Sequence, residues 1–240
     1  MSISRSRLDR FISEKCGMSR RDVRLLVAQK RILIDDNITD DISIIINKFS
    51  KVVLDGKVLQ NNTASYVMLH KPTGVVCATK DEQHQTVIDL LHLPEKDQLH
   101  IVGRLDLNTS GLVLLTNDSR WSERLTTPEN KVKKRYIVTL QNALTEDYIA
   151  AFEQGMYFPF ENITTRPAAL TLLSSHVAQV DLVEGRYHQI KRMFGRFRNP
   201  VIALHRQSIG QLCLDTHLAL GESRYLTPLE VNQIDSVDGI

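Results

Sequence analysis

The sequence contains few cysteines and no long apolar run. Its three cysteines, Cys16, Cys77 and Cys213, lie far apart and never form a C-x-x-C pair, so neither a disulfide framework nor a zinc site is predicted. No stretch approaches the roughly 18 consecutive apolar residues that a membrane span needs. The first residues, MSISRSRLDRF, lack the apolar core of a secretory signal. We therefore expect a cytoplasmic protein that has no contact with a membrane.

Several signatures of cofactor and hydrolase chemistry are also missing. The chain contains no G-x-x-x-x-G-K-[ST], no G-x-G-x-x-G, no H-E-x-x-H and no G-x-S-x-G. Their absence disfavours nucleotide hydrolysis, dinucleotide redox chemistry, zinc proteolysis and the usual serine hydrolases. We expect a protein that needs neither a metal nor another cofactor.

The net charge of +2 is small, but its distribution is uneven. Residues 1–31 hold nine Lys or Arg against three acidic residues, a local net charge of +6, and residues 184–206 hold six against one, a local net charge of +5. Such clusters are typical of a surface that binds a phosphate backbone, although ordinary solvated helices would also account for them. The N-terminal arginines predicted to contact RNA are Arg7, Arg20, Arg21 and Arg24. On a helix, the last three fall in a sector beside the one predicted to be buried.

The length of 240 residues and the hydrophobic fraction of 42% suit a large domain with a smaller one. We expect a small α/β domain over residues 1–60, a linker over 61–65 in the polar stretch QNNTAS, and a larger domain over 66–240. Strand-like segments outnumber helical ones and do not alternate with them, which favours an α+β fold with a mixed, largely antiparallel sheet.

Hydrophobic periodicity and capping residues predict the individual elements. Expected caps include Ser6 and Ser19 for two N-terminal helices, Thr145 for a central helix and Thr227 for a final one. In the larger domain we expect strands at 66–69, 75–78, 112–116, 136–140, 169–173, 177–183 and 201–204. We expect helices there at 119–125, 146–154 and 188–197, and another from 228.

One segment carries a carboxylate in a setting suited to chemistry. Asp106 lies in the run VGRLDLNTSG, which leads directly into the apolar segment LVLLTND. A carboxylate in a loop next to a rigid strand is held in position and remains open to a ligand. From the pattern alone, Asp106 could be a nucleophile, a base or the cap of a turn.

The run GRLDLNTSGLVLLTND closely resembles the catalytic motif of pseudouridine synthases, in the subfamily that modifies small-subunit ribosomal RNA. The segments YVMLHKPTGVVCAT, KKRYIV, EGRYHQIKRMF and LHRQSIG resemble other motifs of that family, in the same order. The N-terminal sixty residues resemble an S4-type RNA-binding domain. The resemblance covers nearly the whole chain.

The resemblance implies a role for particular residues. Asp106 would attack or deprotonate the ribose of the target uridine, Tyr136 would stack on the flipped uracil, and Lys191 would pair with Asp106. His188 is expected to serve at a helix start rather than in the chemistry. The positions implied to contact the substrate are Arg104, Arg186, Ile190, Leu204 and Arg206.

The implied activity is the isomerisation of a uridine to pseudouridine in 16S small-subunit ribosomal RNA, free or in a precursor particle, by a monomer without a cofactor. The segment HQIKRM and the lack of a long basic C-terminal tail favour small-subunit over large-subunit ribosomal RNA as the substrate. A synthase that acts on large-subunit RNA or on tRNA is an alternative. A non-catalytic RNA-binding factor in ribosome assembly is another, because the charge clusters suit it equally well.

Overall fold

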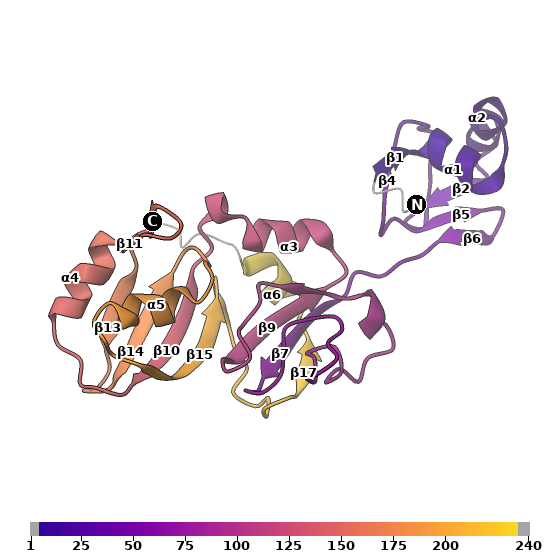
Figure 1. Ribbon diagram of the computed structural model, residues 1–240. Helices are drawn as coiled ribbons and strands as arrows, with labels where there is room; N and C mark the ends of the chain where they lie inside the picture. Colours follow the sequence, from indigo (N-terminus) through magenta and orange to yellow (C-terminus); the bar gives the residue numbers. More distant parts are fainter. Residues whose placement is uncertain (1–4, 235–240) are drawn as a thin grey trace. The chain divides into compact units, whose positions relative to one another are not determined.

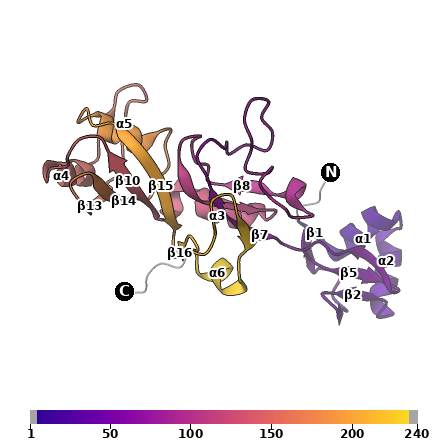
Figure 2. The same cartoon turned by 90° about the horizontal axis from the view of Figure 1, so that it is seen from below.

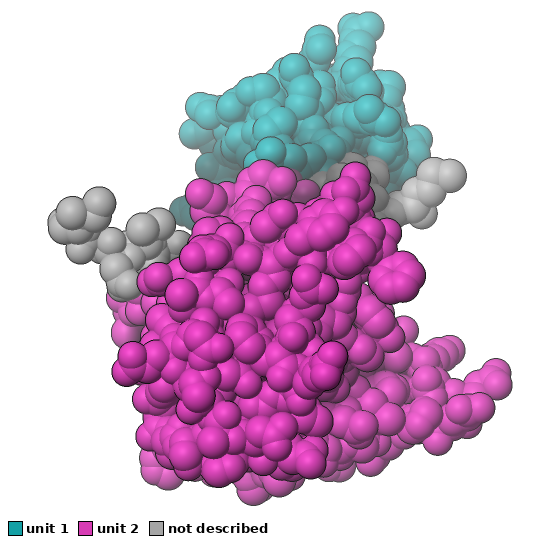
Figure 3. All heavy atoms as spheres, turned by 60° about the vertical axis from the view of Figure 1, so that its left-hand side comes forward, with its two compact units in different colours: residues 1–64 teal, residues 65–240 magenta. Residues whose placement is uncertain are grey.

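The computed structural model describes residues 5–234. The chain divides into two compact units, Met1–Ala64 and Ser65–Ile240, which Figure 3 distinguishes by colour. The boundary falls within the polar stretch in which we expected a linker. Within residues 5–234, every helix is too short or too polar to cross a membrane.

The first unit combines two helices with short strands (Figure 1). The strands β2, β3, β5 and β6 form an antiparallel sheet in the order β3-β2-β5-β6, while β1 pairs with β4. Its elements are β1 (Arg5–Arg7), α1 (Leu8–Cys16), α2 (Arg20–Ala28), β2 (Ile32–Ile34), β3 (Asn37–Ile38), β4 (Ile45–Asn47), β5 (Val52–Leu54) and β6 (Lys57–Gln60). One apolar core joins both helices to these strands, so the unit has an interior of its own.

The helix ends of this unit are those predicted from the sequence, with one exception. Ser19 caps α2, because its hydroxyl accepts the backbone N–H of Asp22, and Gly17 ends α1 with a left-handed φ of 68°. Ser6 was expected to cap α1, and this expectation is wrong. Ser6 instead lies in β1 opposite Ile46, and the helix begins at Leu8 without a side-chain cap. Arg7 occupies the N-cap position instead, and the hydroxyl of Ser6 donates to the carbonyl of Arg7 at 3.3 Å.

The second unit is built on a nine-stranded sheet whose main path runs β13-β14-β10-β15-β9-β7-β17. Strands β8 and β16 pair with β9 and β15, and the pair β15 and β9 is parallel whereas the other pairs of this sheet are antiparallel. The strands are β7 (Tyr66–Lys71), β8 (His100–Val102), β9 (Ser110–Thr116), β10 (Lys134–Leu140), β13 (Ala169–Leu172), β14 (Val177–Leu182), β15 (Val201–Ile209), β16 (Leu212–Cys213) and β17 (Ser223–Tyr225). The expected mixed, largely antiparallel α+β fold is confirmed.

Helices cover both faces of this sheet, as Figure 2 shows for α5 and α6. The helices are α3 (Ser119–Thr126), α4 (Asp147–Gln154), α5 (Gln189–Gly195) and α6 (Pro228–Gln233), with short 3-10 helices at Lys96–Gln98 and Pro128–Asn130. A separate hairpin consists of β11 (Tyr157–Phe158) and β12 (Ile163–Thr164). One core lies under α4 and α5, and the other lies under α3 and α6. Because β9 is buried on both faces, its sequence is a continuous apolar run instead of an alternating one.

Two further expectations for this unit are wrong. Residues 75–78 do not form a strand. Val76 makes only an isolated bridge to Thr86, while its buried neighbours Val75 and Cys77 fill the core from a loop. Thr145 does not cap α4, because its hydroxyl bonds the carboxylate of Asp147 and the helix begins after Glu146 without a side-chain cap. Thr227 does cap α6, through a reciprocal pair of hydrogen bonds with Glu230.

Candidate active site

Asp106 lies in the loop of residues 103–109 that joins β8 to β9. A fully buried lysine, Lys71 at the end of β7, holds this loop from beneath. Its ammonium group donates to the carbonyls of Thr109 at 2.8 Å, Pro72 at 2.9 Å and Leu107 at 3.4 Å. Burial lowers the pKa of Lys71, while the nearby Cys77 and Asp106 oppose that shift. The carbonyl groups compensate for part of the cost of burying the ammonium group, and the contacts fix the backbone around Asp106.

A second buried cation connects the start of this loop with β9, the strand that follows it. Arg206 on β15 is 1% exposed. Its Nε donates to the carbonyl of Leu112 at 2.8 Å and its Nη2 donates to the carbonyl of Gly103 at 2.7 Å. Arg206 was expected to contact the substrate, but it does not line the cleft beside Asp106. Its guanidinium group therefore binds main-chain carbonyl groups and does not face the cleft.

Gly111 allows β9 and β15 to approach closely where the loop enters β9. Its φ is 111°, and a Cβ at this position would lie 2.3 Å from the carbonyl oxygen of Arg206. Only glycine fits such a conformation and such a contact. The glycine that ends the run NTSG is therefore required by the parallel pairing of these strands.

A cleft of about 100 Å³ lies beside Asp106, and it is open to solvent on one side. Seven of the eight residues expected to act on or contact the substrate line it: Arg104, Asp106, Tyr136, Arg186, Ile190, Lys191 and Leu204. These residues come from the loop of residues 103–109, from β10 and β15, and from α5 and the turn before it. The fold therefore brings together segments that are far apart in the sequence.

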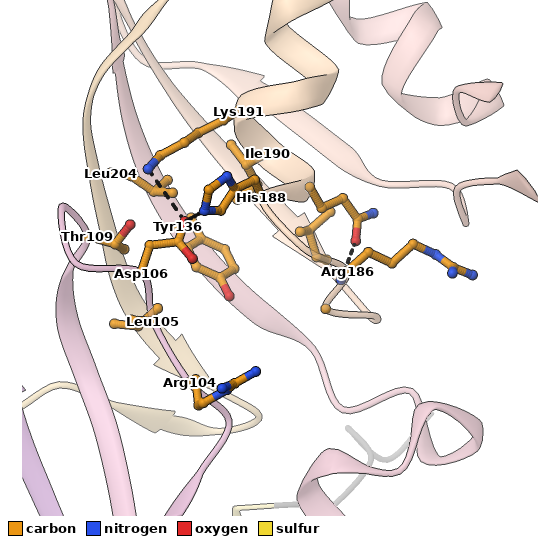
Figure 4. Close-up of a pocket in the computed structure, with 13 residues that line it drawn as sticks. Arg104, Leu105, Asp106, Thr109, Tyr136, Arg186, His188, Ile190, Lys191 and Leu204 are labelled. Carbon is orange, nitrogen blue, oxygen red and sulfur yellow. Dashed lines mark hydrogen bonds and ion pairs between the residues drawn. The ribbon is translucent and has the colours of Figure 1, made fainter. Parts of the chain in front are cut away.

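Two nitrogen atoms converge on one oxygen of Asp106. Lys191 Nζ and His188 Nε2 each lie 3.4 Å from Asp106 Oδ2, and about a third of each of the three side chains is exposed. Figure 4 shows both side chains pointing toward Asp106, with the ring of Tyr136 beside them. Tyr136 is buried on β10, which makes its ring a fixed wall of the cleft. The site can therefore stabilise a negative charge on Asp106 and hold a flat ring close to it.

The turn before α5 is organised by a buried carboxylate. Glu184 accepts hydrogen bonds from Gln189 Nε2 at 2.7 Å, from the backbone N–H of Arg166 at 2.9 Å and from Arg186 Nε at 3.1 Å. Gln189 in turn accepts the backbone N–H of Arg186 at 3.0 Å. These bonds fix the turn in which His188 adopts a left-handed backbone with φ of 48°. Strain of this kind is frequent at functional sites.

Two further polar groups belong to the segments that form the cleft, the loop of residues 103–109 and β10. Thr109 lines it, and its buried hydroxyl has no hydrogen-bond partner within residues 5–234. Lys134, two residues before Tyr136 on β10, donates to the carbonyl of Val132 at 3.2 Å. Burial, together with the charge of Arg206, lowers the pKa of Lys134 to about 8.

Comparisons with known proteins identify the family of this chain. A family model described as RNA pseudouridylate synthase matches residues 65–195. The ribosomal small subunit pseudouridine synthase A of Pseudomonas aeruginosa is 46% identical over 232 residues, which cover 96% of this chain and 100% of that protein. The chain belongs to the RNA pseudouridylate synthase family. It is therefore an enzyme that isomerises uridine to pseudouridine in RNA.

Other relatives of the synthase extend over almost its whole length. The ribosomal small subunit pseudouridine synthase A of Escherichia coli is 39% identical over 229 residues, 95% of this chain and 99% of that protein. A crystal structure of a pseudouridylate synthase aligns with a TM-score of 0.70 and 38% identity, covering 95% of this chain and 99% of that one. The expected family and enzyme class are confirmed.

The synthase carries an exposed basic face on its first unit. Arg20, Arg21 and Arg24 lie exposed on α2, and none of them forms an ion pair within residues 5–234. Arg7 is also exposed, but it pairs with the buried Asp9 at 3.3 Å. Three of the four arginines predicted to contact RNA therefore present their guanidinium groups to solvent on one helix, and Arg7 is already engaged.

A metal site is not evident in the described part of the synthase. Within residues 5–234, no three His, Cys, Asp or Glu side chains are grouped so that they could hold a metal ion.

Sequence reasoning missed several residues that the site uses. His188 was assigned to a helix start, and it does lie at the N-cap of α5, yet it also contacts Asp106. Lys71 and Glu184 lie in the segments HKPTG and EGRYHQ, but no pattern shows that these charges are directed inward. A charged residue next to apolar strand residues, as in YVMLHKP, is the signal that could have drawn attention to Lys71.

Proposed function

We propose that the protein converts one uridine of small-subunit ribosomal RNA to pseudouridine, with Asp106 as its catalytic carboxylate. The observation that carries the proposal is the pair of contacts of 3.4 Å from Lys191 and His188 to Asp106, beside the ring of Tyr136. The printed names of the similar synthases support the small ribosomal subunit as the source of the RNA.

The reaction explains why these side chains are needed together. The bond between N1 of uracil and C1′ of the ribose breaks, the base turns, and C5 bonds to C1′. The proton on C5 leaves, and N1 takes up a proton. Asp106 starts the reaction either by attacking C1′ or by removing a proton from the ribose. In both cases it must carry a negative charge, and the ammonium group of Lys191 lies 3.4 Å from its Oδ2.

The base must be kept in the cleft while its bond to the ribose is broken. A uridine reaches the cleft only after it leaves the helical stack, which costs a few kcal/mol. Tyr136 stacks on the flipped uracil and assists the removal of the C5 proton, and Ile190 and Leu204 close the walls of the pocket. Arg104 and Arg186 contact phosphate or help to displace the base.

The remaining features follow from the chemistry. No redox change or group transfer occurs, so we infer that the enzyme acts without a cofactor. Because the substrate is ribosomal RNA or a ribosomal precursor particle, we infer that the enzyme acts in the cytoplasm. We also infer that it acts as a monomer.

The substitution Asp106→Asn tests the catalytic assignment. Since C5 loses its hydrogen, release of tritium from RNA labelled at C5 of uridine measures turnover. The variant should release no tritium, while its Kd for the RNA stays within about tenfold of the parent value, because Asn keeps the shape of the side chain. Asp97→Asn, at an exposed position of the same unit, is the matched control and should turn over normally. Parent-like release by Asp106→Asn would refute the assignment.

Mapping pseudouridine in the RNA of cells that lack the protein tests the substrate. We expect one site to disappear from small-subunit ribosomal RNA. A site that disappears from large-subunit RNA or tRNA instead would overturn that part of the proposal and leave the catalytic assignment intact.

We also propose that the first unit is an S4-like domain that binds the phosphate backbone through α2. Replacing Arg20, Arg21 and Arg24 with Gln should reduce the slope of log K against log salt by about 0.7 to 0.9 for each phosphate that α2 no longer neutralises. Arg10→Gln is the control, because Arg10 is paired with Glu14 at 2.7 Å. An unchanged slope in the triple variant would show that α2 is not the RNA-binding face.

A further inference from the structure

Tyr187 is an aromatic side chain that the fold leaves 76% exposed. It lies in the turn before α5, directly before His188. The two rings are stacked, with centroids 3.9 Å apart and planes inclined by 18°. One face of the Tyr187 ring is therefore occupied, and the other is open to solvent.

The stack begins at the proposed catalytic carboxylate. His188 Nε2 lies 3.4 Å from Asp106 Oδ2, and the left-handed backbone of His188 aims its ring into the cleft (Figure 4). Tyr187 stacks on that ring and is itself largely exposed. The two rings thus form an aromatic surface that begins at Asp106 and ends in a side chain open to solvent.

Arg192 holds the backbone of Tyr187 in position. Arg192 Nη1 donates to the carbonyl of Tyr187 at 3.4 Å. The same guanidinium forms two bonds of 2.6 Å to Glu161 and lies 3.8 Å from the ring centroid of Phe158, both of which belong to the β11–β12 hairpin. A ring on a fixed backbone loses little conformational entropy when it stacks on a ligand.

The charge around Tyr187 indicates the kind of ligand. Its immediate neighbour Arg186 is half-exposed, and Lys191 lines the cleft beside Asp106. A ligand suited to this surface has both a flat π-face and negative charge, as a nucleotide of RNA has. We propose that Tyr187 stacks on the base of an unpaired nucleotide next to the target uridine.

This inference rests on the proposed function and adds a requirement for the substrate. When the target uridine leaves its helix, the neighbouring base loses a stacking partner, and the outer face of Tyr187 replaces it. The enzyme should therefore select a uridine whose neighbour is free of base pairing, in a loop or at a bulge.

A double-mutant cycle between protein and RNA tests the proposal. The proteins are the full-length parent, Tyr187→Ala and Tyr187→Phe, with Tyr225→Ala as the control for removal of a half-exposed tyrosine on β17. The RNAs are a small-subunit ribosomal RNA fragment with the modified uridine and two versions with an abasic position directly 5′ or 3′ of it. The measurements are the Kd and KM of each pair, kcat, and the melting temperature of each protein.

On the intact RNA, Tyr187→Ala should raise Kd and KM by about tenfold, the range of one base stack, while kcat and the melting temperature stay close to the parent values. Tyr187→Phe should bind like the parent, because it keeps the ring. With one of the two abasic RNAs, Tyr187→Ala should raise Kd by less than about twofold relative to the parent protein, since the stacking partner is already absent from that RNA.

Two results would overturn the inference. One is an equal weakening on all three RNAs, and the other is a Tyr187→Phe variant as weak as Tyr187→Ala. The cycle in Kd does not depend on turnover, so it decides the role of Tyr187 separately. A parent protein that forms no pseudouridine would count against the proposed function and not against the stacking of Tyr187.

Discussion

A substitution of the buried Arg206 tests how the loop of residues 103–109, which carries Asp106, is held in position. Its two hydrogen bonds join the carbonyls of Gly103 and Leu112, one on each side of Asp106 in the sequence. The substitution Arg206→Met keeps most of the volume of the side chain and removes both donors. It leaves two carbonyl oxygens in the interior without these donors.

The magnitude follows from these hydrogen bonds. A hydrogen bond from a charged donor contributes about 1.5 to 3 kcal/mol, so the two bonds together contribute about 3 to 6 kcal/mol. Methionine also removes the cost of burying a guanidinium, which offsets part of this difference. We expect the free energy of unfolding of the second unit to fall by about 2 to 4 kcal/mol.

The assay uses the single tryptophan of the chain. Trp121 is buried in the second unit, so its fluorescence during urea titration reports on that unit without the first. Arg196→Met is the control, because Arg196 is exposed at the C-cap of α5, where a substitution should change stability by less than about 0.5 kcal/mol.

Catalysis by the same variant distinguishes positioning from substrate contact. If Arg206 holds the loop, kcat should fall because Asp106 is less well positioned, while KM for the RNA stays within about twofold. A variant of unchanged stability with a raised KM would refute this reasoning and restore the substrate contact that the sequence suggested.

Two other substitutions test buried positions in the same region. The pKa of Lys134 falls from 10.5 to about 8 on folding, so between these pH values the unfolded chain binds more protons and stability rises with pH, by up to about 3 kcal/mol. Lys134→Met should therefore be more stable than the parent at pH 7, and this advantage should disappear toward pH 10 in urea titrations. An advantage that is constant across this range would contradict the lowered pKa. Gly111→Ala should destabilise the second unit by about 3 kcal/mol or more and abolish turnover, because its Cβ would meet the backbone of Arg206 at 2.3 Å. A variant with the parent's urea midpoint and kcat would show that β9 and β15 do not approach so closely.

Local patterns predicted most of the fold, and their failures have a common cause. Apolar runs such as LVLLT and the caps Ser19 and Thr227 led to the observed elements, because these signals depend on neighbours in the sequence. Residues 75–78 look like a strand by composition, but they form only the isolated bridge from Val76 to Thr86, and the buried side chains of Val75 and Cys77 fill the core from a loop. Ser6 and Thr145 are good capping residues whose polar groups are engaged elsewhere.

The sequence by itself determined the family, the α+β fold and the candidate carboxylate, because the motif around Asp106 is long and specific and the apolar periodicity is strong. Only the tertiary structure decided which cations act on the cleft and which hold its backbone. Lys191 and Arg206 look alike in sequence, yet Lys191 reaches Asp106 from α5 whereas Arg206 is directed between two strands. The direction of a charged side chain depends on which strands become neighbours, and pairing between segments almost a hundred residues apart is not encoded in any local pattern.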